Sequence, residues 1–260
     1  MNLSEKSDDP RGSQRLAASI DPAELEKFAA MADEWWDPNG KFRPLHQLAP
    51  VRLAFIRREF GRQFGVDEKQ PEPLRGRRVL DIGCGGGLIS EPMARLGGTV
   101  TGVDAVEKNI AIARAHAAGM GLDIDYRTGT AEQMEAAGDG GFDLILNLEV
   151  VEHVADLDAF LEACTGLLAP GGVMIVSTIN RTAKAFALAI VGAEYVLRWL
   201  PRGTHDWSKF LKPSELTRAL RGHGLELAAL DGMTYSPVTG NWGLDRGDVS
   251  VNYLAAFAHS

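Results

Sequence analysis

The chain has 260 residues, of which 45% are hydrophobic and 24% are charged. The length fits one domain, or one domain with additions, and the composition is ordinary for a globular protein, which excludes a chain that is disordered throughout. Its 27 Lys and Arg against 35 Asp and Glu give a formal net charge of −8, so no basic field for nucleic acid is expected. Two cysteines, Cys84 and Cys164, are too few for a disulfide framework, and the polar start lacks an apolar signal segment; both favour a reducing cytoplasm.

The first part of the chain predicts a tail and then a helix. Residues 1–20 are polar and are expected to be disordered. Asp21, Pro22 and Glu24 match an N-cap, a first-turn proline and the closing residue of a capping box. The turn residues Asp37-Pro38-Asn39-Gly40 mark the end of that helix.

A second helix is predicted from Pro50 to about Phe64, followed by a polar, proline-containing linker up to residue 76. Residues 21–76 are therefore expected to form a helical cap.

From Arg77 onward, short apolar runs alternate with helical stretches. The runs predict strands at 78–82, 99–103, 124–127, 142–147 and 173–178. Helices are predicted near 88–97, 107–119, 156–168 and 214–221, and final strands near 225–230 and 251–257. This alternation is typical of βαβ units around a parallel sheet, so residues 77–260 are expected to form one α/β domain.

The clearest candidate site is a glycine-rich turn, Gly83-Cys84-Gly85-Gly86-Gly87, between a predicted strand and a predicted helix. Glycine permits positive φ and lets a ligand approach bare backbone. Asp104 ends the next predicted strand, where an acidic side chain accepts hydrogen bonds from the ribose hydroxyls of a nucleoside. The pattern indicates a nucleoside cofactor; the plainer alternatives are an unliganded turn and an Asp that caps a helix.

The glycine spacing distinguishes two classes of cofactor. A dinucleotide pattern starting at Gly83 needs glycine at position 88, where Leu88 stands. The spacing is instead Asp-x-Gly-x-Gly-x-Gly from Asp81, which resembles motif I of the S-adenosylmethionine-dependent methyltransferases. Other motifs agree in order: Glu132, Phe142–Ile145 and Leu167–Gly172. The resemblance implies a Rossmann-like class I methyltransferase fold, with a seven-stranded, mostly parallel sheet, an antiparallel last strand, an N-terminal helical cap and an inserted helix.

Segments between about residues 24 and 257 resemble one family, the O-methyltransferases of ubiquinone biosynthesis. They are Trp35–Asp37, Phe42–His46, Asn147–Val154, Val191–Tyr195, Gly203–Trp207 and Asp248–Tyr253, with Ser250 as an inserted or shifted position. The resemblance implies methyl transfer from S-adenosylmethionine to ring hydroxyls of polyprenylated catechol and demethylubiquinol intermediates. The alternatives are another small-molecule methyltransferase of this fold and a non-catalytic cofactor-binding scaffold.

The resemblance also implies a set of cofactor-binding residues. They are Arg52, Asp81, Gly83, Gly85, Asp104, Glu132 and Leu148. Leu148 stands where relatives carry Met, which suits packing against adenine. A guanidinium at Arg52 also suits the methionyl carboxylate of the cofactor, whereas a solvated helix arginine is the plainer interpretation.

An acidic segment after the fourth strand, Glu149-x-x-Glu152-His153, is the candidate catalytic site. Methyl transfer needs removal of a phenol proton, and an unperturbed phenol has a pKa of about 10. Glu149, Glu152 and His153 are candidate ligands for Mg²⁺ or another divalent cation that would acidify the phenol. Alternatively His153 is a metal-free base, or the segment is structural. His205 and Asp206 form a second acid–base candidate.

The apolar stretch 183–200 predicts a helix inserted within residues 181–212. Its charged residues Lys184, Glu194 and Arg198 lie within about 80° of one another on a helix. Three charges in so short a segment disfavour a membrane span, so a helix in the membrane interface, a lid over an apolar pocket or an ordinary buried helix is expected. In the membrane interface, the cations of this region would face the lipid headgroups; they are Arg181, Lys184, Arg198 and Arg202. The expected partners are a polyprenylated substrate, a membrane lipid surface and other quinone-biosynthesis enzymes, and the expected location is cytoplasmic at the periphery of the inner membrane.

Overall fold

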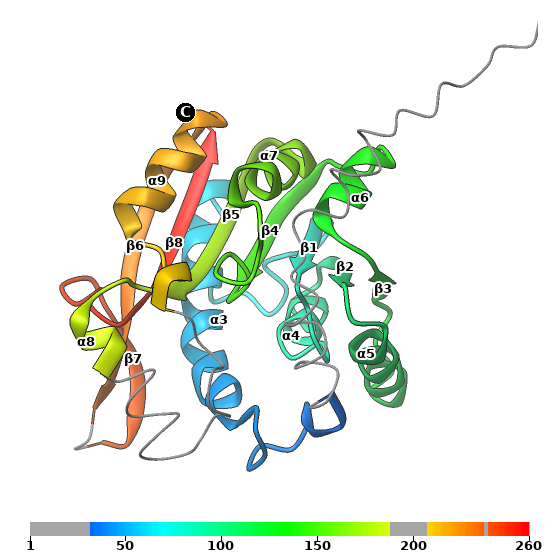
Figure 1. The fold of residues 1–260 in the computed structure, drawn as a ribbon. Coiled ribbons are helices and arrows are strands. Elements are labelled where there is room, and N and C mark those ends of the chain that lie inside the picture. The colour runs from blue at the N-terminus through cyan, green and yellow to red at the C-terminus, as the bar shows by residue number, and fades with distance from the viewer. Residues whose placement is uncertain (1–31, 188–206, 237–238, 260) are drawn as a thin grey trace, which may run out of the picture.

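The computed structural model describes residues 32–187, 207–236 and 239–259. Within them one eight-stranded sheet has the order β3-β2-β1-β4-β5-β8-β6-β7 (Figure 1). Strands β1 to β5 run parallel to one another. Strand β8 is antiparallel to both β5 and β6, and β7 is antiparallel to β6. The sheet is therefore parallel on one side and antiparallel on the other.

The elements follow one another along the chain as alternating strands and helices. The strands are β1 (Arg78–Ile82), β2 (Thr99–Asp104), β3 (Asp125–Thr128), β4 (Phe142–Leu148), β5 (Leu168–Ile179), β6 (Leu225–Ser236), β7 (Asn241–Asp245) and β8 (Asn252–His259). The helices are η1 (Ala32–Glu34), α3 (Arg43–Phe64), α4 (Ser90–Arg95), α5 (Glu107–Gly119), α6 (Ala131–Ala136), α7 (Leu157–Leu167), α8 (Ala183–Ala185), η3 (Trp207–Lys209) and α9 (Pro213–Gly222).

The predicted α/β architecture is confirmed, with two additions. The five parallel strands and the antiparallel last strand lie where the sequence predicts them. The expectation of seven strands is wrong by one, because β7 forms a hairpin with β6 at the sheet edge. Helix α6 was also missed; it is only six residues long, and Thr130 and Gln133 close its capping box.

The predicted start of the second helix, Pro50, is wrong. Helix α3 begins at Arg43, and Pro50 lies inside it. Pro44, at the helix start, is the proline in the position that the chain tolerates best. The buried face that includes Val51, Phe55 and Phe60 continues the helix through Pro50, because burial of large apolar side chains offsets the loss of one backbone hydrogen bond.

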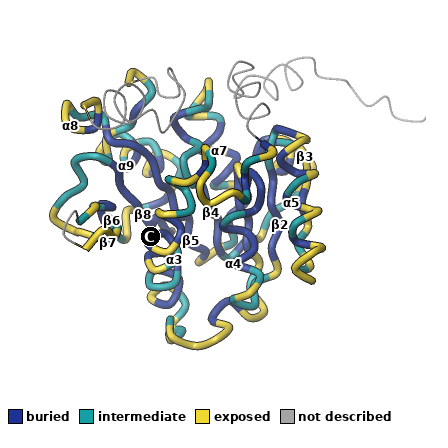
Figure 2. The backbone as a smooth tube through the Cα atoms, turned by 90° about the horizontal axis from the view of Figure 1, so that it is seen from below, coloured by how far each residue is buried: buried dark blue, intermediate teal, exposed yellow. Residues whose placement is uncertain are grey.

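Alternating side chains of each strand enter two cores, one on each face of the sheet. Leu80 and Ile145 face the core that α7 and α9 cover. Val79 and Leu144 face the core that α3 covers with its phenylalanines. Figure 2 shows the buried stretches at the centre of the molecule and the exposed ones at its rim. The doubly covered parallel strands present their carboxyl ends at one edge, where ligands bind in such folds.

The polar tail 1–20 and residues 21–31 of the helix predicted from Asp21 lie outside the described residues. So do His205, Asp206 and most of the segment 183–200, of which α8 and the two residues after it are described. The end of the helix predicted from Asp21 is the short 3-10 helix η1. Across the described ranges, every helix is too short or too polar to cross a membrane.

Candidate active site

The glycine turn after β1 and the acid at the end of β2 lie together. Gly83 and Gly85 have φ of +67° and +54°, a region that disfavours residues with a Cβ. The backbone N–H of Gly85 donates to Oδ2 of Asp104 at 2.9 Å, and that of Val106 donates to Oδ1 at 2.8 Å. The structure therefore brings the glycine turn and Asp104 together, as the sequence analysis predicts.

The Asp104 carboxylate is enclosed but well bonded. Burial raises its pKa above the ordinary value, and the N–H donors, including the side chain of Asn109 at 3.2 Å, oppose that shift. Three donors on a carboxylate fix its orientation. The Asp104 carboxylate is therefore already oriented as a hydrogen-bond acceptor.

Asp81 lies beneath the turn and is buried. Its Oδ2 accepts a hydrogen bond from the Ser90 hydroxyl at 2.5 Å, which ties the end of β1 to the first residue of α4. Burial and then the charge of Asp104 raise the pKa of Asp81 to about 7. Asp81 therefore links the two elements on either side of the glycine turn.

Arg52 reaches the same edge from α3. Its side chain is 4% exposed, and Nη2 donates to Oε1 of Glu149 at 2.6 Å. Its buried Nε has no hydrogen-bond partner among the described residues. An unsatisfied buried donor is costly, so this N–H is suited to an anionic ligand at the site.

Glu149 follows Leu148, the last residue of β4, and has φ of +57°. It is the one residue other than glycine with positive φ within the described part of the chain. Besides Arg52, its Oε1 accepts a hydrogen bond from the buried Ser177 hydroxyl at 2.7 Å. The carboxylate is thus directed toward α3 and β5 by a strained backbone.

Glu152 and His153 lie in the turn that follows. Glu152 is 4% exposed, and one of its carboxylate oxygens has no hydrogen-bond partner in the described structure. Burial, and then the charge of Glu149, raise the pKa of Glu152 well above its ordinary value. His153 is half-buried, and its backbone N–H donates to the Val150 carbonyl at 2.8 Å.

The predicted metal ligands do not form a ligand set. Within residues 32–187, 207–236 and 239–259, no three His, Cys, Asp or Glu side chains come together as a metal site. Glu149 is bonded to Arg52 and Ser177. Glu152 is buried and belongs to no such cluster of side chains among the described residues.

Glu132 follows β3 at the start of α6. It is in the first turn of α6 and is buried, with both carboxylate oxygens lacking a partner among the described residues. Its charge contributes to a raised pKa of the Cys164 thiol on α7. Its observed neighbour is therefore α7, and no hydrogen bond joins it to Asp104.

Side chains that the sequence did not predict cover the turn. A Cβ on Gly83 would lie 2.5 Å from a methyl group of Val150, and one on Gly85 would lie 2.3 Å from the Trp35 ring. Trp35 and Trp36 were identified as part of a family motif, but no spacing rule connects them to the turn.

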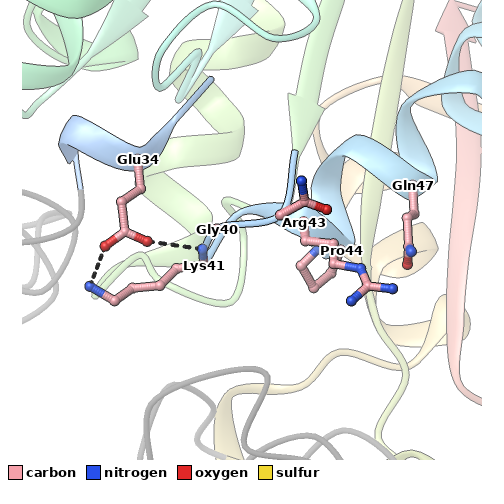
Figure 3. A pocket seen from close by; sticks show the side chains of 7 residues that line it. Glu34, Gly40, Lys41, Arg43, Pro44 and Gln47 are labelled. Atoms are coloured by element: carbon pink, nitrogen blue, oxygen red, sulfur yellow. Dashed lines mark hydrogen bonds and ion pairs between the residues drawn. The ribbon is translucent and has the colours of Figure 1, made fainter. Parts of the chain in front are cut away.

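A cavity of about 330 Å³ lies beside the segment that carries these tryptophans. It is lined by Glu34, Asn39, Gly40, Lys41, Arg43, Pro44 and Gln47. One wall is held by Glu34, which accepts hydrogen bonds from the Lys41 ammonium and backbone N–H (Figure 3). No predicted site residue lines this cavity, so it is not the glycine-turn site.

The described start of the inserted segment is bonded to the C-terminal part of the chain. Lys184 Nζ donates to Asp248 and Ser250, each at 2.9 Å. Arg181 forms an ion pair with Glu215. Both cations, which an interfacial helix would direct toward lipid headgroups, are ion-paired within the chain.

Comparisons with known proteins agree with this geometry. A family model described as a methyltransferase domain matches residues 45–230. The chain is 59% identical to the ubiquinone biosynthesis O-methyltransferase of Dinoroseobacter shibae over 92% of this chain and 96% of that protein. It is 55% identical to the protein of the same name from Sinorhizobium fredii, over 93% and 97% of the two chains.

Solved structures share the fold at low identity. The magnesium protoporphyrin IX methyltransferase of Synechocystis with bound SAH matches with a TM-score of 0.59 and 18% identity, over 96% of this chain and 94% of that one. A SAM-dependent methyltransferase of Thermotoga maritima matches with a TM-score of 0.60 and 17% identity, over 91% and 100% of the chains.

Proposed function

The chain belongs to the family of ubiquinone biosynthesis O-methyltransferases, and we propose that it methylates ring hydroxyls of polyprenylated phenol and demethylubiquinol intermediates. S-adenosylmethionine is the methyl donor of this class of enzyme. The observation that carries the proposal is the contact between the glycine turn and Asp104 at the carboxyl edge of the parallel strands. That arrangement suits a nucleoside with free ribose hydroxyls.

The polar groups of the site match the two ends of the donor. Asp104 accepts from the ribose with the lone pair on Oδ2 that its three N–H donors leave free. The unpartnered Nε–H of Arg52 is available to the methionyl carboxylate. Leu148 contributes an apolar contact for adenine. When bound, S-adenosylmethionine supplies a methyl group already activated on its sulfonium, so the protein mainly positions the two reactants.

The remaining chemical requirement is removal of the phenol proton. His153, half-buried in the turn after β4, accepts that proton as a general base. Glu149 accepts a hydrogen bond from Arg52 and so holds the guanidinium at the site. Glu152, held in its neutral form, keeps a second negative charge away from the phenolate.

A divalent cation does not fit the side chains as they lie, and no step is derived through one. Glu149 is already bonded to Arg52 and Ser177, and Glu152 is buried. The metal-dependent route makes a different prediction in the assay below.

We place the protein at the cytoplasmic face of the inner membrane, where polyprenylated substrates and other quinone-biosynthesis enzymes are found. The support is the apolar pattern of residues 183–200. Vesicle co-sedimentation of wild type beside an Ile190→Glu, Leu197→Glu variant tests the location. Equal sedimentation of both would refute it.

The test of the reaction is incubation with labelled S-adenosylmethionine and a short-chain demethylubiquinol, with and without EDTA. Label in the quinol fraction, unaffected by EDTA and lost in His153→Ala, is the expected result. Loss with EDTA and return with Mg²⁺ would replace the His153 base by the metal-dependent route. No transfer by a protein that binds the cofactor would favour a different acceptor or a scaffold.

A further inference from the structure

The segment Ala32–Phe42 lies on the glycine turn and on α5. The Trp35 ring is stacked on Phe42, with ring centroids 3.8 Å apart. A Cβ on Gly86 would lie 2.6 Å from Trp35 Cβ and Cγ, so this side chain rests directly on the turn. Trp36 stacks on His116 of α5 at 3.5 Å and donates from Nε1 to the Gly86 carbonyl at 3.0 Å.

A single amide joins this segment to the acid at the end of β2. Asn109, in the first turn of α5, is 1% exposed. Its Oδ1 accepts from Trp35 Nε1 at 2.9 Å, and its Nδ2 donates to Asp104 Oδ1 at 3.2 Å. An amide has a donor end and an acceptor end. The indole N–H therefore requires the oxygen to face Trp35 and leaves the NH₂ group to face Asp104.

We propose that Trp35 and Asn109 are positioning residues of the cofactor site. Through them, docking of the segment Ala32–Phe42 on the glycine turn also orients the Asp104 carboxylate. The inference rests on the proposed function, because it takes Asp104 as the acceptor for ribose hydroxyls. By reciprocity, ribose binding favours the docked segment by the same factor as docking favours ribose binding.

A packing role alone would also explain why Trp35 is buried, so the test removes the indole N–H and keeps the ring. Trp35→Phe retains an aromatic ring against Phe42 and the turn. Affinity is measured by calorimetry for S-adenosylhomocysteine and for an analogue whose ribose lacks both hydroxyls. The expected loss is about five- to tenfold for S-adenosylhomocysteine, as for one hydrogen bond, and less than about twofold for the analogue.

Trp36→Phe is the matched control. It removes an indole N–H from the same segment and from a bond of similar length, but one that ends on the Gly86 carbonyl rather than on Asn109. Any effect of Trp36→Phe is expected to be equal for the two ligands. Equal losses for both ligands in Trp35→Phe would reduce Trp35 to a packing residue and overturn the inference.

A double-mutant cycle of Trp35→Phe with Asn109→Ala gives the second readout. The two losses are expected to be strongly non-additive, because each breaks the same bridge. Asn109→Leu fills the space if Asn109→Ala does not fold, as judged by thermal unfolding. Additive losses would overturn the relay. Asp104→Ala tests the premise separately from the relay. If wild type shows no preference for the ribose hydroxyls, or if Asp104→Ala loses no affinity, the role that the proposed function gives to Asp104 is refuted.

Discussion

The turn after β1 and the turn after β4 lie at the same edge of the sheet and are built in opposite ways. In the first, positive φ falls on glycines, and both Asp104 oxygens accept hydrogen bonds. In the second, positive φ falls on Glu149, and an oxygen of buried Glu152 has no partner among the described residues. Strain and unsatisfied groups gather at functional sites. The comparison indicates that the polar groups of the first turn are bonded within the protein, whereas the second turn concentrates backbone strain and an unsatisfied carboxylate oxygen.

The largest effect is expected from a substitution that adds a side chain between the glycine turn after β1 and Trp35. Gly85→Ala places a Cβ 2.3 Å from the Trp35 ring, on a backbone with φ of +54°. We expect a loss of about 3–5 kcal/mol in the free energy of unfolding, from overpacking and backbone strain together. Urea denaturation measures it.

Gly121→Ala is the matched control, since Gly121 has φ of +67° with nothing within 4 Å of an added Cβ. Backbone strain alone is expected to cost about 1–2 kcal/mol. Similar losses in both variants would mean that Trp35 yields and that the turn is not closely covered.

The buried acid under the first turn predicts a pH dependence. The pKa of Asp81 is raised to about 7 in the folded protein, from an ordinary value of 3.8. The folded state therefore holds a proton that the unfolded state has lost, so this contribution to stability is fully present below about pH 4 and is lost as the pH rises through 7. We expect Asp81→Asn to gain about 4 kcal/mol over wild type between pH 4 and pH 8.

Unfolding free energies of the two proteins across that range provide the measurement. A difference that stays constant with pH would show that folding does not raise the pKa of Asp81. Asn at this position still accepts the Ser90 hydrogen bond, so the comparison isolates the proton.

Removing the acceptor of the first turn acts on binding rather than on folding. Asp104→Ala is expected to weaken S-adenosylmethionine binding by about 1–3 kcal/mol, because ribose hydroxyls lose a charged acceptor. Calorimetry on the folded variant tests this. Unchanged affinity would contradict the assigned role and would leave the bonds to Gly85 and Val106 as purely structural.

The second turn predicts a smaller change. Burial favours the neutral form of Glu152, so Glu152→Gln is close to isosteric and is expected to alter the free energy of unfolding by less than about 1 kcal/mol. Glu149→Gln is the control; it removes the partner of buried Arg52 and is expected to cost more. A larger loss in Glu152→Gln would mean that Glu152 is ionised and paired.

The sequence predicted the first turn better than the second, for a physical reason. Spacing determined Gly83, Gly85 and Asp104, because a glycine turn and a strand end are local features that the sheet brings together. The partners of Glu149 could not be predicted, since Arg52 and Ser177 come from α3 and β5 through tertiary packing alone. The hairpin strand β7 and the Trp35 contact were missed for the same reason.

The smallest effect is expected at the described start of the inserted segment. Lys184 was expected to meet lipid headgroups, but its ammonium is bonded to Asp248 and Ser250 on the exposed surface. Hydrogen bonds to Asp248, of which that from Ser250 has the largest effect and that from Lys184 the next, hold the pKa of Asp248 below its ordinary range. Because exposed pairs contribute little, Lys184→Ala is expected to leave the unfolding midpoint unchanged. Sedimentation with anionic vesicles should also match wild type, since a paired cation has little charge to offer a headgroup. A clear loss of vesicle binding in Lys184→Ala would show that the pair opens at a membrane and that this surface, unlike the glycine turn, is remade by its ligand.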